Sequence, residues 1–173
     1  MMQSQKYLLQ DLEKFLKINE AFEKEIENES LRKLLSVQDK ISIFRDIDPY
    51  DLEAIVYDVK FVKYKQKDYI IRQKQTREEI FFIISGECFV YSDNKKVGDL
   101  RSGEVFGEGG AIFKTPRSAS VVCASKDAVL ISFCINENNL EFCASAIATL
   151  YKNLAFEINA KLEDVNHAFG QKL

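Results

Sequence analysis

The stretch EEIFFIISGECFVYSDNKKVGDL, residues 78–100, decides the fold class. It consists of short runs rich in Val, Ile, Phe and Tyr, which favour strands, and the runs are broken at Gly86 and at Asp93 and Asn94, which favour tight turns. Similar segments lie on either side of it: DVKFVKY (58–64), DYIIRQ (68–73), SASVVCAS (118–125) and AVLISF (128–133). About eight short strands in succession predict a β-barrel or jelly roll.

Helical patterns precede this strand region. Residues 4–28 carry apolar side chains at alternating steps of four and three, with Asn19 at one seam position; the apolar members are Leu8, Leu12, Phe15, Phe22 and Ile26. Such a stripe predicts either a coiled coil, in which a buried Asn fixes the register, or a surface helix packed on its own domain. Further helices are expected over residues 30–38 and over Pro49–Val56, where Asp48 is a typical N-cap and proline a typical first helical residue.

From Asn136 to Phe169 the apolar residues again recur with the spacing of a helix. The apolar face of this segment is formed by Ile147, Leu150, Leu154, Ile158, Leu162 and Val165. An unbroken helix of this length would run to about 50 Å, longer than a small barrel can cover, so part of its apolar face is expected to meet a second subunit. The sequence thus predicts a mainly β fold with flanking α elements: an N-terminal helical segment (1–38), a β-barrel (39–135) and a C-terminal helical segment for a lid or dimerisation (136–173).

The composition of the 173-residue chain narrows its function. The formal net charge of -3 provides no basic surface for nucleic acid. No run of about 18 apolar residues and no signal peptide occurs, so a cytoplasmic location without membrane contact is expected. Four cysteines without CxxC spacing are expected to be buried and inert. His167 is the only histidine, which argues against a metal site and against Ser/His/Asp catalysis.

The segment from Ser102 to Val121, SGEVFGEGGAIFKTPRSASV, carries the candidate chemistry. Four of the seven glycines lie in it, and a helical turn that begins near Glu108 would aim free backbone N–H groups at an anion. Arg117 could return over this loop as a bidentate phosphate ligand, and Glu108 could accept a hydrogen bond from a sugar hydroxyl. Together, a cation for a phosphate and an acceptor for a hydroxyl could bind a phosphorylated sugar. The same Glu and Arg could instead form an exposed ion pair without function.

Within this segment, FGEGGAIFKTPRSASV resembles the phosphate-binding cassette of the cyclic-nucleotide-binding domain family, which includes the bacterial catabolite activator protein, kinase regulatory subunits and cyclic-nucleotide-gated channels. The family pattern of FGE followed by PR, a small or hydroxyl residue and Ala fits Phe106–Glu108 and Pro116–Ala119 without a gap. FRDIDPYDLEAI resembles the helix that leads into the family's barrel, and IFFIISGECFVY resembles its central hairpin. The resemblance extends from about Ile41 to Phe133.

The resemblance implies that Arg117 binds the cyclic phosphate and that Glu108 binds the ribose 2'-hydroxyl. It implies a ligand site without catalytic or metal-binding residues, formed by Phe106, Gly107, Glu108, Gly109, Gly110, Ala111, Arg117, Ser118 and Ala119. The implied ligand is cyclic AMP or cyclic GMP, with cyclic AMP favoured, and no further cofactor is expected. Ser118 occupies the position at which a hydroxyl contacts guanine in some relatives.

Four residues differ from the family pattern. Gly109 and Gly110 replace an apolar and a small residue, which is expected to loosen the turn, since glycine in a helix is disfavoured by up to about 1 kcal/mol relative to Ala. Lys74 and Lys114 replace frequent glycines. Lys74 indicates a different local turn without a ligand contact, and Lys114 is expected to point to water rather than to the phosphate.

We therefore predict a regulatory sensor, not an enzyme, that binds a cyclic nucleotide and responds through its C-terminal helix. Tyr151, Leu150 and Leu154 are candidates to stack on the base, although a core or dimer role is favoured for each. The chain ends at Leu173 without room for a DNA-reading domain, so an unidentified protein effector or a change in assembly is expected to carry the output. A homodimer is expected through the tail helix, with the N-terminal helix as a second candidate interface. Two alternatives stay open. The first is a dimerisation or docking scaffold that has lost its ligand. The second, less favoured, is an enzyme acting on a phosphorylated sugar, for which the cassette offers only Glu108 as a catalytic group.

Overall fold

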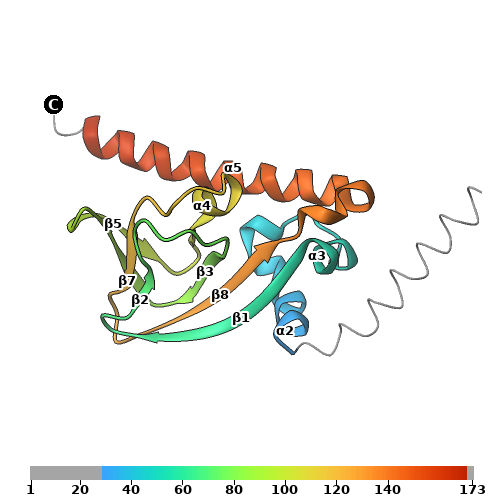
Figure 1. Cartoon of the computed structure of the whole chain (residues 1–173), viewed down its shortest axis with the longest axis horizontal. Coiled ribbons are helices and arrows are strands. Elements are labelled where there is room, and N and C mark those ends of the chain that lie inside the picture. The colour runs from blue at the N-terminus through green and yellow to red at the C-terminus, as the bar shows by residue number, and fades with distance from the viewer. Residues whose placement is uncertain (1–28, 171–173) are drawn as a thin grey trace, which may run out of the picture.

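The computed structural model describes residues 29–170, in which two four-stranded antiparallel sheets pack against each other (Figure 1). One sheet has the strand order β1-β8-β3-β6 and the other has the order β2-β7-β4-β5. The strands are β1 (Val56–Lys65), β2 (Tyr69–Ile71), β3 (Ile80–Ser85), β4 (Glu87–Ser92), β5 (Lys95–Arg101), β6 (Val105–Phe106), β7 (Ser120–Cys123) and β8 (Asp127–Ile135). The predicted fold class is confirmed. Strand β6 is missing from the sequence-based segments because two residues are too few to display an alternating pattern.

The described helices precede the barrel, interrupt it once and follow it. They are α2 (Glu29–Val37), the 3-10 turns η1 (Gln38–Lys40) and η2 (Ser42–Phe44), α3 (Pro49–Ile55), α4 (Glu108–Ile112), η3 (Glu137–Asn139) and α5 (Leu140–Gly170). The Asp48 carboxylate accepts a hydrogen bond from the Tyr50 amide at 2.9 Å, so α3 has the predicted N-cap. The helix expected over 4–28 lies outside the described residues. Within residues 29–170, no helix combines the length and the apolar content that a membrane span requires.

Strand β3 divides the core into two parts because both of its faces are buried. Ile80 and Phe82 belong to the part that continues into α2, α3 and α5, whereas Phe81 and Ile83 belong to the part enclosed by the two sheets. The four cysteines are buried and unpaired, as expected, and burial raises the pKa of Cys88 to about 12.

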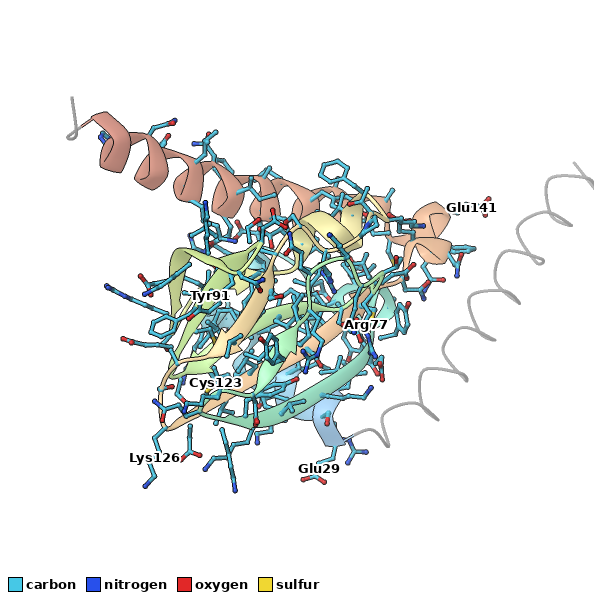
Figure 2. All side chains as sticks on the ribbon, turned by 60° about the vertical axis from the view of Figure 1, so that its left-hand side comes forward. Glu29, Arg77, Tyr91, Cys123, Lys126 and Glu141 are labelled. Carbon is cyan, nitrogen blue, oxygen red and sulfur yellow. The ribbon has the colours of Figure 1, made fainter. Side chains whose placement is uncertain are left out.

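Helix α5 crosses the barrel and continues past its edge (Figure 1). We call residues 140–154 the near segment of α5 and residues 155–170 its far segment. The near segment buries Ile147, Leu150 and Leu154, whereas Ile158 and Leu162 of the far segment are 39% and 55% exposed. Figure 2 shows the described side chains of this helix, and its label Glu141 lies near the start of α5. The apolar face predicted for this segment therefore runs from the core out to the surface.

Candidate functional site

The loop after β2 fixes the backbone of Arg117, which lies in the loop between α4 and β7. The Arg117 amide donates to the Gln75 carbonyl and the Lys74 amide donates to the Arg117 carbonyl, both at 2.8 Å. Lys74 has a φ of 69°, a left-handed conformation that glycine adopts more readily. Lys74 therefore forms a left-handed turn of the type in which glycine is common. The backbone of this turn positions Arg117, the candidate phosphate ligand.

The Arg117 guanidinium is buried at the base of the glycine-rich segment, with 5% of the residue exposed. Its Nη2 donates to the Glu79 carbonyl at 2.6 Å and lies 3.7 Å from the Glu79 carboxylate, and its Nη1 donates to the Gly107 carbonyl. Nε is buried and has no hydrogen-bond partner among the residues that the structure describes. Burial lowers the pKa of Arg117, and the Glu79 carboxylate opposes this shift. A buried guanidinium with an unused donor suits an anionic ligand.

Two glycines allow α4 to pack against the Arg117 side chain. Gly107 precedes α4 with a φ of 86°, and a Cβ atom there would lie 2.9 Å from Nη1 of Arg117. A Cβ atom at Gly110 would lie 3.1 Å from both Cδ and Nη1 of Arg117, whereas one at Gly109 would meet nothing within 4 Å. Gly110 is therefore a close-packing position, in contrast to the expectation that it only loosens the turn.

Glu108 is the first residue of α4, and its carboxylate contacts the far segment of α5. Its Oε1 accepts a hydrogen bond from Nζ of Lys161 at 2.8 Å, and the two side chains are 14% and 29% exposed. Lys161 Nζ also donates to the Val105 carbonyl at 2.5 Å. Sequence reasoning missed Lys161 because it lies 53 residues from Glu108 and a lysine flanking an amphipathic helix face gives no signal for such a contact.

A cavity of about 240 Å³, which we call the cassette cavity, brings Arg117, Glu108 and Lys161 together. It is lined by Ile71, Val90, Leu100, Phe106, Gly107, Glu108, Gly109, Gly110, Arg117, Ser118, Ala119, Val121 and Lys161. The structure places every residue of the predicted site at this cavity except Ala111, which packs against the helical part of the core. Phe106 is mainly a core residue, since its ring stacks on Phe81 with centroids 5.2 Å apart.

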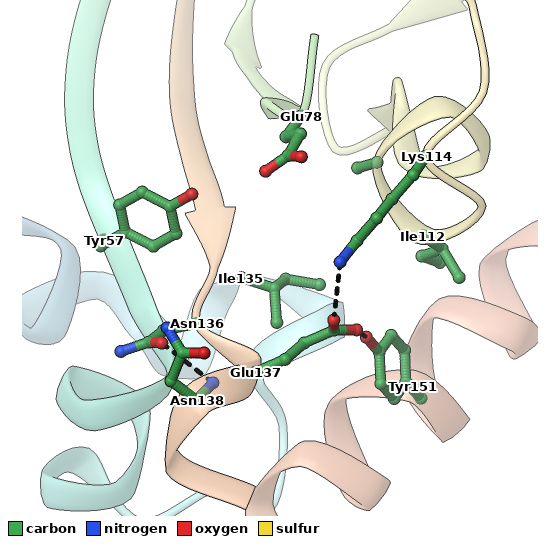
Figure 3. Close-up of a pocket in the computed structure, with 10 residues that line it drawn as sticks. Tyr57, Glu78, Ile112, Lys114, Ile135, Asn136, Glu137, Asn138 and Tyr151 are labelled. Carbon is green, nitrogen blue, oxygen red and sulfur yellow. Dashed lines mark hydrogen bonds and ion pairs between the residues drawn. The ribbon is translucent and has the colours of Figure 1, made fainter.

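A second and larger cavity, of about 530 Å³, adjoins the other end of α4 (Figure 3). It is lined by Tyr57, Glu78, Ala111, Ile112, Lys114, Ile135, Asn136, Glu137, Asn138 and Tyr151. Ala111 is the only residue of the predicted site that lines it. The cassette cavity is a better candidate site than this larger one, because the buried Arg117 and the Glu108 carboxylate both line it, whereas Lys114, the cation of the larger cavity, is 64% exposed.

Lys114 forms an ion pair in the larger cavity instead of pointing only to water. Its Nζ lies 3.3 Å from Oε2 of Glu137, and the Tyr151 hydroxyl donates to the Glu137 carboxylate (Figure 3). The Tyr151 hydrogen bond and then Lys114 lower the pKa of Glu137. Burial, followed by the contact with Glu137, raises the pKa of Tyr151 to about 12. These three side chains link the segment after α4 to η3 and α5.

The three candidates for base stacking lie away from the cassette cavity. Leu150 and Leu154 are fully buried in the helical part of the core, and Tyr151 lines the larger cavity. Ser118 does line the cassette cavity, and its carbonyl accepts a hydrogen bond from Nε2 of Gln73 at 3.0 Å. Within residues 29–170, no group of three or more His, Cys, Asp or Glu side chains could hold a metal ion.

The two packed sheets, the C-terminal helix and the cassette cavity can be compared with known proteins. Residues 61–140 match the family model described as the cyclic nucleotide-binding domain. The chain is 31% identical over 90 residues to the cGMP-dependent protein kinase of Toxoplasma gondii, covering 52% of this chain and 9% of the kinase. It is 31% identical over 104 residues to the potassium/sodium hyperpolarization-activated cyclic nucleotide-gated channel 1 of Homo sapiens, covering 60% of this chain and 11% of the channel. The chain thus spans about a tenth of the curated relatives it matches.

Solved structures support the same fold. A cyclic nucleotide-binding domain from Methylobacillus flagellatus superposes with a TM-score of 0.65 at 16% identity, over 83% of this chain and 84% of that domain. The regulatory domain of Toxoplasma gondii PKA with cAMP superposes with a TM-score of 0.57 at 17% identity, over 76% of this chain and 52% of that one. At these identities the likeness concerns the fold alone.

Proposed function

We propose that this domain is a regulatory sensor that binds a cyclic nucleotide monophosphate, with Arg117 as the phosphate ligand and Glu108 as the ribose ligand. The observation that carries the proposal is a buried guanidinium with an unused donor on the wall of a cavity that also contains a mostly buried carboxylate. An anionic phosphate and a hydroxyl donor on one small molecule match this pair of groups.

We propose cyclic AMP in preference to cyclic GMP. Apart from Glu108, Arg117 and Lys161, the side chains that line the cassette cavity are apolar or are absent at glycine, with Ser118 as the exception. Guanine presents more polar groups on its edge than adenine, and burying them against apolar side chains without partners costs free energy. The relatives include proteins named for each nucleotide, so the choice rests on the cavity wall.

We also propose that the domain regulates rather than catalyses. The lining of the cassette cavity contains no histidine or cysteine that could serve as a base or a nucleophile beside Glu108. The response of the barrel (39–135) is then carried by the C-terminal segment (136–173) to a second copy of the chain or to a protein effector. The far segment of α5 favours a second copy, because Phe156 and Leu162 are 66% and 55% exposed.

Isothermal titration with cyclic AMP and with cyclic GMP tests the proposal. The wild-type protein is expected to bind cyclic AMP more tightly. Arg117→Ala is expected to weaken binding by about 100-fold or more, because the positive charge and the charge-assisted hydrogen bonding of the guanidinium to the phosphate are lost. Arg72→Ala is the matched control, since this arginine stacks on Tyr69 and does not line the cassette cavity. Affinity retained within about threefold in a folded Arg117→Ala protein would contradict the assignment of the phosphate ligand.

A scaffold that has lost its ligand is the second candidate function, and the contact between Lys161 and Glu108 favours it because an internal lysine already occupies the ribose acceptor. A thermal melt separates the two functions. A ligand at 100 times its dissociation constant stabilises a folded protein by about 2.7 kcal/mol, so the sensor is expected to melt at a higher temperature with the nucleotide. The scaffold is expected to melt at the same temperature with and without either nucleotide.

A further inference from the structure

Lys161 ties the far segment of α5 to the carboxylate that the proposed function assigns to the ribose. Its Nζ lies 2.8 Å from Oε1 of Glu108 and 2.5 Å from the Val105 carbonyl oxygen. The side chain is 29% exposed, so most of it is enclosed, and it forms part of the wall of the cassette cavity. One side chain of α5 thus belongs both to the helix and to the ligand site.

Within the described side chains of the far segment, little else holds it to the barrel. Among its side chains that the structure describes, none is buried, and only Glu157 and Lys161 are half-buried. Among the described side chains of the helix, Leu154 is the last buried apolar one, about two turns before Lys161. Asn159 donates to Glu163 within the helix, and the described far segment has no hydrogen bond or ion pair to the barrel other than those of Lys161. The position of the far segment therefore depends on Lys161 more than on apolar packing.

The space that Lys161 occupies is space that a ligand needs. The cassette cavity measures about 240 Å³ with Lys161 in its wall, whereas small-molecule sites usually measure about 300–1,000 Å³. The Glu108 carboxylate is 14% exposed, so it offers little open surface to another donor while the ammonium group lies against it. Withdrawal of one lysine side chain would enlarge the cavity and expose this carboxylate at the same time.

We infer that Lys161 competes with the nucleotide for Glu108. When the ribose hydroxyl donates to Glu108, Lys161 withdraws and the far segment loses its polar contacts with the barrel. Glu108 then exchanges a hydrogen bond from Lys161 for one from the ribose, so the lysine does not block ligand entry. Displacing the lysine costs free energy, which lowers the apparent affinity for the ligand. This inference rests on the proposed function, because it concerns the same carboxylate.

Lys161→Met tests the competition, because methionine removes the ammonium group and keeps an unbranched side chain. The affinity for cyclic AMP, measured by isothermal titration, is expected to rise about three- to tenfold, the size of the effect of a partly screened ion pair. Without nucleotide, amide hydrogen exchange over residues 155–163 is expected to accelerate by a similar factor. Lys161→Arg keeps the ion pair and is expected to behave like the wild type. Lys152→Met changes an exposed lysine of the near segment and serves as the matched control without effect.

A double variant shows whether the gain acts through Glu108. In a Glu108→Gln background the shared carboxylate is absent, so Lys161→Met is expected to add no further affinity. Weaker binding by Lys161→Met than by the wild type would overturn the inference, since Lys161 would then be a ligand contact. If the wild type binds cyclic AMP and Lys161→Met changes neither affinity nor exchange, the inference alone fails. If no protein in the series binds either nucleotide, the proposed function fails and the competition fails with it, while the exchange rates still report whether Lys161 holds the far segment.

Discussion

The near and far segments of α5 belong to one helical element, whose kink at Cys143 lies within the near segment, but they are held to the barrel in different ways. The near segment buries Leu150 and Leu154 completely, and its Asn153 side chain donates to the Ile43 and Arg45 carbonyls at 3.1 and 2.8 Å. The far segment has no buried side chain among those described and reaches the barrel through Lys161. The near segment is therefore part of the folded core, whereas the far segment contacts the wall of the cassette cavity through Lys161.

The largest expected effect that separates the two segments is on global stability. Leu154→Ala removes a fully buried side chain and is expected to lower the free energy of unfolding by about 2–5 kcal/mol. Phe156→Ala changes a side chain that is 66% exposed and is expected to change this free energy by less than about 0.5 kcal/mol. Urea denaturation at a concentration at which the protein is monomeric measures both. Equal losses would mean that the far segment is as much a part of the core as the near one.

A smaller effect is expected on the formation of the proposed homodimer. Leu162→Glu places a charge on the apolar part of the far segment and is expected to raise the dissociation constant of a homodimer by about tenfold or more, because the charge would be buried without a partner. Lys152→Glu on the near segment is the control and is expected to leave association unchanged. Sedimentation velocity over a concentration series measures the constant. A monomeric wild type over the whole series would contradict the proposed homodimer.

The smallest expected effect is the pH dependence of the link between the near segment and the segment after α4. The pKa of Glu137 is lowered in the folded protein, first by the Tyr151 hydrogen bond and then by Lys114. A carboxylate with a lowered pKa stabilises the fold above its ordinary pKa and loses this contribution as the pH falls through the folded value. Wild type is therefore expected to melt slightly above Glu137→Gln near about pH 7, and the difference is expected to vanish near about pH 3. A difference in melting temperature that stays constant over this range would contradict the role of the ionised carboxylate.

Local patterns were sufficient to predict most of the fold. The alternating strands, the Asp48 cap of α3 and the helical turn at Glu108 each depend on residues that are close in sequence, and the structure contains all three. Lys74 and Lys114 have φ values of 69° and 51°, a left-handed conformation that glycine adopts more readily than lysine. The two lysines therefore occupy turns that would also suit the glycines frequent in the family.

The features that the sequence could not predict depend on contacts across the fold. The pairing of Lys161 with Glu108 requires the path of α5 over the barrel, and the close approach of Gly110 to Arg117 requires the return of the loop before β7. Ala111 shows that, even within the cassette motif, the sequence does not tell which residues line the same cavity. It is next to Gly110 in sequence but lines the larger cavity, because consecutive residues of a helix point in different directions.

The burial of all four cysteines has a practical consequence for following the far segment in solution. Burial raises the pKa values of Cys88, Cys123, Cys134 and Cys143, which keeps these thiols protonated and shielded from alkylating reagents at neutral pH. A single cysteine introduced at an exposed polar position of α5, as in Asn166→Cys, would be the preferred target of a maleimide dye. The natural protein thus already provides a background for a fluorescent reporter of helix movement, without removal of any native cysteine.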